Sequence, residues 1–421
     1  MKIIITEKPS VARDLAKVFG ATTKREGYIE GKGYSFTWAF GHLLQLAPPQ
    51  EYGYIGWKAK NLPMLPQRLK LSVRKIKTKD GIVEDPSIRK QLNTIKMLFD
   101  MASEIIVATD AGREGELIFR YIYHYLQCKK PFRRLWISSQ TDAAIKEGFR
   151  NLKPGKEYDT LFYSAHCRSE SDWLVGMNAT QALSISAGSK TVLSLGRVQT
   201  PTLGMICSRY LENKNFVPQT YFQISILLHK NEQYFKAISK KNYNKKEEAE
   251  QILRAVKDQA SGIPNGAEII KVEAKTKKEP PPLLHDLSSL QQEANKKKGY
   301  TADETLSILQ RLYEEKLITY PRTGSQYIGD DVFATVPELI EKQQGHPQFG
   351  KHAVYLKSQK LNKRSVNAKK VTDHHAILPT GEVPRNLPSD KQEIYDMIIA
   401  RMLEAFHEIC VKDLTKIIIE S

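Results

Sequence analysis

The stretch that decides the fold, residues 105–116, has the sequence IIVATDAGREGE. Its first five residues are apolar or β-branched and predict a short buried strand. Two glycines then open a helical pattern over Leu117–Leu126. A second unit of the same kind lies at the N-terminus, where the strand Lys2–Thr6 is followed by Pro9 in the first turn of a helix. Repeated strand, loop and helix predict an α/β sheet with parallel strands over residues 1–150.

Downstream of this α/β segment the pattern changes. Residues 160–183 and 200–211 are helical, and residues 218–275 alternate as strands around one charged helix, Lys245–Val256. A Lys- and Pro-rich stretch at residues 275–282 is typical of a linker or hinge. The sequence therefore predicts a multidomain protein with α/β, helical and β-rich parts.

The charge of the chain favours nucleic acid as its partner. Of 421 residues, 64 are Lys or Arg and 47 are Asp or Glu, so the formal net charge is +17. An excess of this size indicates nucleic acid first, an anionic membrane surface second and solubility alone third. Six basic residues and no acid lie between Arg68 and Lys79. Taken alone, such a run is as typical of a solvated strand or loop as it is of a nucleic-acid-binding site.

The composition excludes several classes of protein. Hydrophobic residues make up 41% of the chain, which excludes wholesale disorder. No apolar run approaches the roughly 20 residues that span a bilayer, and the N-terminus meets charge too early for a signal peptide. The four cysteines form no CxxC pair, so we expect neither a disulfide framework nor a structural zinc site. These features predict a soluble, intracellular protein.

Acidic residues follow both predicted parallel strands. Glu7 comes directly after the first strand and Asp110 directly after the second, so both should lie at the carboxyl edge where such sheets bind ligands. Carboxylates brought together there repel each other unless a proton or a divalent cation intervenes. With Glu114 close in sequence, oxygen ligation of Mg²⁺ is indicated. Each acid taken alone is more typical of a helix cap, and Lys8 beside Glu7 is ambiguous in isolation.

These residues carry a family resemblance. Glu7-Lys8-Pro9-Ser10 after an N-terminal strand, with Asp110-x-Gly112-x-Glu114-Gly115-Glu116 about a hundred residues later, resembles the Toprim domain. That domain is shared by type IA and type II topoisomerases, primases and some nucleases. The family pattern is often Asp-x-Asp-x-Glu, whereas residue 112 is glycine here. The resemblance therefore implies reduced ligation of Mg²⁺, by Glu7, Asp110 and Glu114.

The stretch Thr319-Tyr320-Pro321-Arg322-Thr323 decides among these families. Pro321 stiffens the turn that presents the phenol of Tyr320. Arg322 places a charged, fork-shaped donor two residues away, suited to a phosphodiester. The stretch is similar to the active-site motif of type IA DNA topoisomerases, in particular the bacterial topoisomerase III branch.

The resemblance continues through most of the chain. Residues 40–43, 168–181, 194–201 and 373–377 are similar to family elements on the DNA path, the last being a histidine motif. The DNA contacts that the resemblance implies are His42, Trp57, Arg168, Trp173, Gln181, Ser194, Leu195, Gly196, Arg197, Val198, Gln199 and Arg322. Singly, Trp173 also has a reading as a core residue, Arg197 as a surface charge, and His374 as a buried histidine or metal ligand.

The resemblance also implies the architecture, four domains arranged as a toroid around a hole large enough for DNA. The expected limits are 1–155 for the Toprim domain, 156–215 for a helical strand-binding domain, 216–278 for the first part of a β-rich arch, 279–405 for the domain that carries the tyrosine, and 406–421 for a return to the arch. Because family members usually continue further, we expect the sequence to be a piece of a longer protein.

The implied reaction is a transesterification. Tyr320 attacks a phosphodiester of single-stranded DNA and forms a 5′-phosphotyrosyl bond, and Arg322 clamps the phosphate. Lys8 is the expected proton donor to the leaving 3′-oxygen, with Glu7 and His374 in support. Mg²⁺ is the expected cofactor, above all for religation. No ATP is expected, since the sequence holds no GxxxxGK[ST] loop.

The expected partners and location follow from the same resemblance. Single-stranded DNA and DNA with single-stranded regions are the expected substrates, for relaxation of negative supercoils and decatenation. The protein is expected to act as a monomer in the cytoplasm, associated with the nucleoid and without a membrane. A helicase partner cannot be read from the sequence.

Two other functions remain open from the residues. A Toprim nuclease or primase would retain Glu7, Asp110 and Glu114 but has no use for the Tyr320-Pro321-Arg322 motif. A single-strand-binding protein with a relic site would explain the +17 charge and Gly112. The formation of a covalent protein–DNA adduct distinguishes the topoisomerase from both.

Overall fold

The computed structural model describes residues 1–79, 81–137, 141–188, 190–260, 267–384 and 386–420. The chain forms two compact units. Unit 1 comprises residues 1–200 and 281–408, and unit 2 comprises residues 201–280 and 409–421. Within unit 1 we call residues 1–200 the sheet lobe and residues 281–408 the helical lobe. The toroid and the domain limits given above stay predictions.

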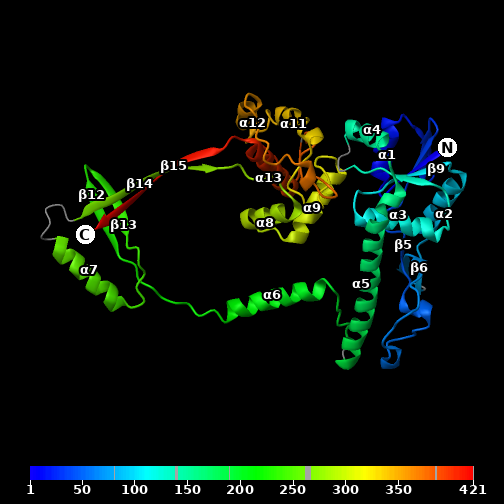
Figure 1. Ribbon diagram of the computed structural model, residues 1–421, viewed down its shortest axis with the longest axis horizontal. Helices are drawn as coiled ribbons and strands as arrows, with labels where there is room; N and C mark the ends of the chain where they lie inside the picture. Colours follow the sequence, from blue (N-terminus) through cyan, green and yellow to red (C-terminus); the bar gives the residue numbers. More distant parts are fainter. Residues whose placement is uncertain (80, 138–140, 189, 261–266, 385, 421) are drawn as a thin grey trace. The chain divides into compact units, whose positions relative to one another are not determined.

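The sheet lobe is built on one mixed sheet (Figure 1). Its strand order is β11-β10-β9-β1-β4-β3-β2. The four central strands run parallel, as the sequence predicts: β10 (Phe132–Arg134), β9 (Glu104–Ala108), β1 (Lys2–Thr6) and β4 (Tyr34–Trp38). The outer strands β11 (Lys153–Pro154), β3 (Tyr28–Gly31) and β2 (Thr23–Arg25) are antiparallel to their neighbours.

Helices cover both faces of this sheet because the side chains of each central strand alternate between two cores. Ile3 and Ile5 face α2 (Pro86–Met101) and α3 (Arg113–Tyr125), whereas Ile4 faces the opposite core with α1 and α4. The latter helices span Pro9–Val18 and Asp142–Arg150. A sheet with both faces covered leaves its strand ends as the place where polar side chains gather.

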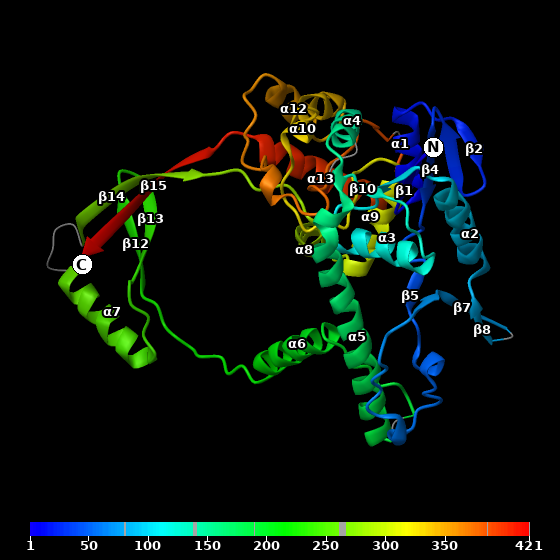
Figure 2. The same cartoon turned by 45° about the vertical axis from the view of Figure 1, so that its right-hand side comes forward.

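A long helix, α5 (Asp159–Ser186), leaves the sheet and runs beside the segment that holds β5 (Leu44–Leu46) (Figure 2). Asn178 of α5 accepts from the amide of Met64 at 2.6 Å and donates to its carbonyl at 3.1 Å. The smaller elements of this region are η1 (Pro49–Tyr52), η2 (Ala59–Asn61), β6 (Leu71–Val73), which pairs with β5, the hairpin of β7 (Lys75–Thr78) and β8 (Gly81–Glu84), and η3 (Gly155–Tyr158).

The helical lobe packs short helices around the central α13 (Ser389–Phe406), whose Ile394, Ile398 and Met402 are buried. The other helices are α8 (Leu287–Lys298), α9 (Ala302–Glu314), α10 (Asp330–Phe333), α11 (Val336–Lys342), α12 (Gly350–Lys357) and η4 (Ala368–Lys370).

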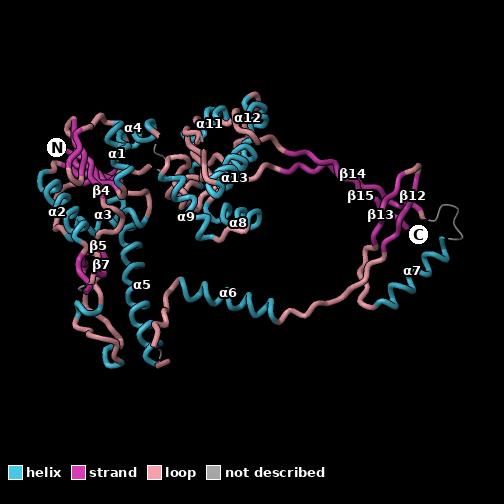
Figure 3. The backbone as a smooth tube through the Cα atoms, turned by 180° about the vertical axis from the view of Figure 1, so that it is seen from behind, coloured by secondary structure: helices cyan, strands magenta, loops and turns pink. Residues whose placement is uncertain are grey.

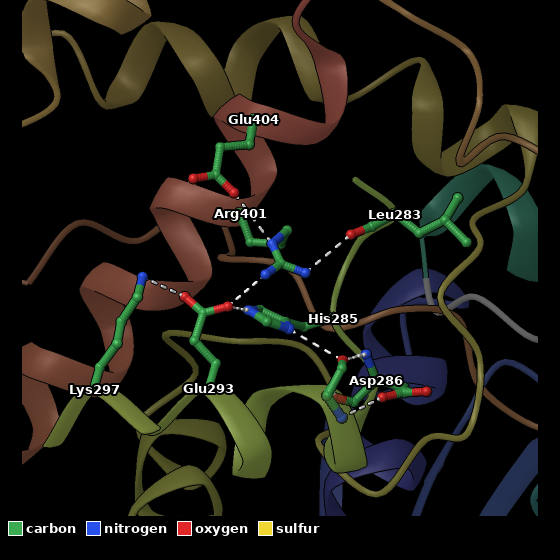
Figure 4. Close-up of polar contacts among 8 residues, drawn as sticks. Leu283, His285, Asp286, Glu293, Lys297, Arg401 and Glu404 are labelled. Carbon is green, nitrogen blue, oxygen red and sulfur yellow. Dashed lines mark hydrogen bonds and ion pairs between the residues drawn. The ribbon is translucent and has the colours of Figure 1, made fainter. Parts of the chain in front are cut away.

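A network of ion pairs and hydrogen bonds connects the start of this lobe to the end of α13 (Figure 4). Glu293 of α8 pairs with Arg401 of α13, with Lys297 at 2.7 Å and with the buried His285 at 3.3 Å. Arg401 also donates to the carbonyl of Leu283 at 3.4 Å. The two chain segments through which the lobe continues into unit 2 are therefore held together by one carboxylate.

Unit 2 consists of two β-ribbons and flanking helices (Figure 3). Strands β12 (Ser225–Lys230) and β13 (Gln233–Ile238) form a hairpin, and β14 (Glu268–Glu279) pairs with β15 (Cys410–Glu420). The charged helix α7 (Lys246–Ala260) is present as predicted, and the boundary between the units falls in α6 (Gln199–Lys214).

The predicted linker at residues 275–282 is wrong in its first half. Residues 275–279 belong to β14, where Lys275 pairs with Leu414 and Glu279 with Cys410. The strand stops at Pro280, which has no amide proton to give to a ladder. Among the described residues, no helix combines the length and apolarity needed to cross a bilayer.

Candidate active site

Tyr320 is positioned by bonds between two segments of the helical lobe. The amide of Thr319 donates to the carbonyl of Leu378 at 2.9 Å, and the amide of Leu378 donates to Thr319 Oγ1 at 3.0 Å. Thr323 Oγ1 donates to the carbonyl of His374 at 2.8 Å. The two segments therefore lie side by side, and the ring centroids of Tyr320 and His374 are 4.4 Å apart.

Lys8 of the sheet lobe lies at the centre of the site. Its Nζ is 4.0 Å from the centroid of the Tyr320 ring, 3.0 Å from Asp110 Oδ2 and 3.7 Å from Glu7 Oε1. Burial favours the neutral amine, but the charges of Asp110 and Glu7 outweigh it and raise the pKa of Lys8 above its ordinary value. Lys8 is therefore a fixed positive charge between two carboxylates and the phenol ring.

In this arrangement the pKa values of the two carboxylates shift in opposite directions. Burial works to raise the pKa of Asp110, but hydrogen bonding to His374 and the charge of Lys8 lower it to about 2. His374 Nε2 lies 3.3 Å from Asp110 Oδ2. Burial and the neighbouring charge of Asp110 raise the pKa of Glu7. Because β1 and β9 pair in register, with Thr6 opposite Ala108, both acids leave the sheet at the same edge.

A buried arginine holds the loop that carries Asp110. Arg134 is 1% exposed and donates to the carbonyls of Val107 at 3.0 Å, Thr109 at 2.8 Å and Asp110 at 2.6 Å. Its Nε lies 3.1 Å from Glu116 Oε2. Neither residue is among the predicted site residues. Glu116 ends the acidic stretch of the sequence, whereas no motif marks Arg134.

Gly115 allows the same loop to fold tightly against the start of α3. A Cβ at this position would overlap the carbonyl oxygen of Asp110. Thr109 Oγ1 donates to the carbonyl of Gly115 at 2.7 Å and closes the loop. The direction in which the Asp110 side chain leaves the sheet is therefore fixed from two sides, by Arg134 and by Gly115.

Glu114 lies apart from these two acids. One of its carboxylate oxygens is 3.5 Å from His42 Nε2 and the other is 3.4 Å from Arg168 Nη1, and the side chain is half exposed. In the part of the chain that the structure describes, no three Asp, Glu, His or Cys side chains gather as ligands of one metal ion. Glu7, Asp110 and Glu114 are therefore not brought together as one set of three.

Comparisons with known proteins identify the family of the chain. A DNA topoisomerase family model matches residues 156–421, and a Toprim domain model matches residues 2–140. The chain belongs to the DNA topoisomerase family. It is 46% identical to DNA topoisomerase 3 of Bacillus cereus over 412 residues, which cover 95% of this chain and 54% of that protein. It is 43% identical to DNA topoisomerase 3 of Shouchella clausii, covering 99% of this chain and 56% of that protein.

A solved structure shares the fold. Full-length topoisomerase I from Thermotoga maritima matches with a TM-score of 0.65 at 22% identity, over 100% of this chain and 63% of that one. The chain spans about half the length of the curated relatives it matches. The predicted Toprim fold at the N-terminus and the type IA fold class are thus confirmed.

A Toprim domain binds Mg²⁺, and the donor set found here is compatible with that ion. Mg²⁺ is bound in many sites by one or two carboxylates, with waters and substrate phosphates completing its shell. Glu7 and Asp110 supply two such carboxylates, which follow paired strands at one edge of the sheet and both lie beside Lys8 Nζ. In this structure Lys8 provides the positive charge between them.

Two of the predicted DNA contacts, His42 and Arg168, line a cleft of about 480 Å³ in the sheet lobe. His42, Arg74, Glu114 and Arg168 are among its lining residues, and Arg74 belongs to the predicted basic run. Arg168 pairs with Glu114 at 3.4 Å and with Asp172 at 3.8 Å. His42 and Arg168 on the wall of the cleft therefore each lie beside an acid.

The loop at residues 194–199 rests on α5. The amide of Leu195 donates to Thr180 Oγ1 at 2.9 Å, and Gln199 Nε2 donates to Ser194 Oγ at 2.6 Å. Arg197 Nε is 3.3 Å from Asp172 Oδ1. Of the remaining members of the loop, Gly196 is partly buried and Val198 is exposed.

Two predicted DNA contacts need correction. Trp173 is 5% exposed and its indole N–H donates to the carbonyl of Ala47 at 2.9 Å, so it is a core residue without a free face for a base. Gln181 is also buried. Trp57 and Arg322, in contrast, lie at the surface, and among the described residues Arg322 forms no ion pair.

Proposed function

We propose that this chain carries the cleavage and religation centre of a type IA, topoisomerase III-like enzyme. The observation that supports this most is the position of Lys8 Nζ, 4.0 Å from the Tyr320 ring and 3.0 Å from Asp110. A nucleophile of one lobe thereby meets the acidic sheet edge of the other. No step needs ATP, because the covalent link conserves the energy of the phosphodiester.

The proposed reaction exchanges one phosphodiester for another. The Tyr320 oxygen forms a bond to phosphorus, the bond from phosphorus to the 3′-oxygen breaks, and a 5′-phosphotyrosyl link and a free 3′-hydroxyl result. A phenol is a weak nucleophile until it gives up its proton, here to solvent, and Lys8 places a positive charge 4.0 Å from the centre of the ring. The exposed Arg322 is available to clamp the phosphate.

Lys8 has two successive roles in this proposal. While it is paired with Asp110 and Glu7, its raised pKa keeps its proton in place. When DNA enters, the negative phosphate competes for the ammonium group, which can then donate a proton to the leaving 3′-oxygen. His374 positions the Asp110 carboxylate through their contact at 3.3 Å.

Glu7 and Asp110 are the residues that would hold Mg²⁺, and Glu114 stands further along the DNA cleft. When bound, the ion supplies a Lewis acid that neutralises phosphate charge and orients the broken 3′-end for religation. The chain's own carboxylates would also keep that end from diffusing away by fixing its position relative to Tyr320.

The substrate follows from the cleft and from the family. Single-stranded DNA, or a single-stranded region of a duplex, would pass His42 and Arg168 on the wall of the cleft, and Arg197 beside Asp172, on its way to Tyr320. Repeated cutting, strand passage and religation would relax negative supercoils and decatenate DNA. We place this action at the nucleoid in the cytoplasm, by a monomer.

A covalent adduct tests the proposal. A single-stranded oligonucleotide labelled at its 3′-end is incubated with the protein and denatured, since the downstream fragment stays attached through its 5′-phosphate. We expect a labelled protein band for the wild type and for Tyr355→Phe, whose hydroxyl pairs with Glu408 elsewhere in the helical lobe. We expect none for Tyr320→Phe.

Two outcomes would overturn the proposal. Cleavage that persists in Tyr320→Phe would indicate a Toprim nuclease, because such an enzyme does not use the tyrosine. Tight binding of the oligonucleotide without any adduct in the wild type would indicate a DNA-binding protein with an inactive site.

A further inference from the structure

A carboxylate from the helical lobe occupies the space beside Gly112. A Cβ built on Gly112 would lie 2.5 Å from Cγ and Oδ2 of Asp373 and 2.6 Å from its Oδ1. Real Cβ atoms essentially never come this close to another group. The Asp373 carboxylate therefore fills the volume into which a side chain of residue 112 would project.

Gly112 is the position at which the sequence departs from the Asp-x-Asp-x-Glu pattern. It lies at the N-cap of α3, in the loop that also carries Asp110. The loop therefore lacks an acid at position 112, and the carboxylate of Asp373, from the helical lobe, lies beside that position. Asp373 is followed directly by His374, which contacts both Asp110 and Tyr320.

Asp373 stands among like charges. Its side chain is exposed, and the charges of Asp110 and Glu114 on the sheet lobe act on its carboxylate, as do those of His374 and Arg113. Within the described part of the chain Asp373 forms no ion pair and no hydrogen bond, whereas Lys8 forms ion pairs with Glu7 and Asp110. A carboxylate held among carboxylates is stabilised by a cation placed between them.

We propose that Asp373 supplies, from the helical lobe, the carboxylate that the loop of Asp110 lacks at position 112, so that a divalent cation held by Glu7 and Asp110 gains a further negative counter-charge when residue 373 lies against Gly112. This inference rests on the Mg²⁺ site of the proposed function. It adds that the site is divided between the two lobes.

A divided site couples cation binding to the contact between the lobes. If the cation binds more tightly with Asp373 in place, then by linkage the cation also stabilises the closed contact of Asp373 with Gly112. The cation would then favour the arrangement in which Tyr320 faces the sheet edge, which is the arrangement that religation needs.

Manganese binding to the DNA-free protein tests this without any turnover. Free Mn²⁺ is measured by electron paramagnetic resonance in a Tyr320→Phe background, with melting curves to verify that each variant folds. We expect Asp373→Asn to weaken Mn²⁺ binding about tenfold, in the range found when groups supporting a metal are removed. Asp303→Asn, an exposed acid at the start of α9, should leave the affinity unchanged.

A swap of positions provides the decisive comparison. Gly112→Asp with Asp373→Ala returns a carboxylate to the loop and removes the group with which it would overlap, so we expect Mn²⁺ affinity to recover towards that of the parent. Gly112→Asp alone should destabilise the closed contact. If Asp373→Asn weakens Mn²⁺ binding and the double variant does not recover it, the Asp373 carboxylate does not take the place of an acid at position 112, and the inference is wrong.

The controls separate this inference from the proposed function. If Glu7→Gln and Asp110→Asn lose Mn²⁺ while Asp373→Asn binds it like the parent, Asp373 is not part of the site and the inference fails, although the proposed function stands. If all three variants bind Mn²⁺ like the parent, the metal site of the proposed function fails as well.

Discussion

The ammonium group of Lys8 lies 4.0 Å from the centre of the Tyr320 ring, although the two residues come from opposite lobes of unit 1. The same nitrogen is 3.0 Å from Asp110 Oδ2. One cation thus joins the nucleophile to the acidic edge of the sheet. Because Lys8 also separates Asp110 from Glu7, removing its charge affects both the phenol and the carboxylates.

Replacement of Lys8 by methionine keeps most of the side-chain volume and removes the charge. We expect adduct formation in a single turnover to slow by about 100-fold, the contribution typical of one acid–base group. Lys17→Met, at the exposed end of α1, is the matched control and should react at the wild-type rate. An unchanged rate in Lys8→Met would exclude Lys8 from proton transfer and from activation of the tyrosine.

The network of Figure 4 predicts a loss of stability in acid. Hydrogen bonding to His285, followed by Lys297 and Arg401, lowers the pKa of Glu293 to about 2 from 4.5. A carboxylate with a lowered folded-state pKa stabilises the fold above its unfolded pKa, and that stabilisation disappears as the pH falls from about 4.5 towards 2. Taken in full it amounts to about 3 kcal/mol.

His285 acts in the same direction at higher pH. Burial lowers the pKa of His285, so the unfolded chain takes up a proton first and stability falls as the pH drops below about 6.5. Urea unfolding at several pH values should therefore show two losses, and Glu293→Gln should remove the more acidic one. Glu341→Gln, an exposed residue paired with Lys357, is the control. Equal acid sensitivity in Glu293→Gln and the wild type would contradict the assignment.

The sheet and its two acids could be predicted because they depend on local patterns. The strands Lys2–Thr6 and Glu104–Ala108 are apolar runs, and parallel pairing brings the residues that follow them, Glu7 and Asp110, to one edge. The sequence also shows the tyrosine motif. It does not show that Tyr320 lies close to Lys8, because that distance depends on packing between lobes that are far apart in the chain.

Other features escaped prediction for physical reasons. The sequence cannot show that the indole of Trp173 finds a backbone acceptor inside the protein instead of a base outside it. It does not show that Glu114 turns to His42 and Arg168, or that a buried Arg134 holds the loop of Asp110. Gly112 was visible as a missing acid, whereas its replacement by Asp373 requires coordinates.

Arg134 predicts a large effect on stability. It is fully buried, and Arg134→Gln would remove its charge and leave Glu116 without that partner. Breaking a buried pair from one side costs about 3–5 kcal/mol, whereas removing both charges costs less. In thermal unfolding we therefore expect Arg134→Gln/Glu116→Gln to melt above Arg134→Gln alone. A double variant that is less stable by the sum of both single effects would show that the two residues act independently.

The position of Arg168 on the wall of the cleft allows a prediction about the binding of single-stranded DNA and its dependence on salt. Its ion pairs with Glu114 and Asp172 are partly exposed, so a phosphate can replace them at little cost. For Arg168→Ala we expect weaker binding of single-stranded DNA and a plot of log affinity against log salt whose slope is smaller by about 0.7, the value for one phosphate contact on a single strand. Arg150→Ala, an exposed arginine on α4, should keep the wild-type slope. If Arg168→Ala keeps both the affinity and the slope of the wild type, the strand does not follow this wall of the cleft.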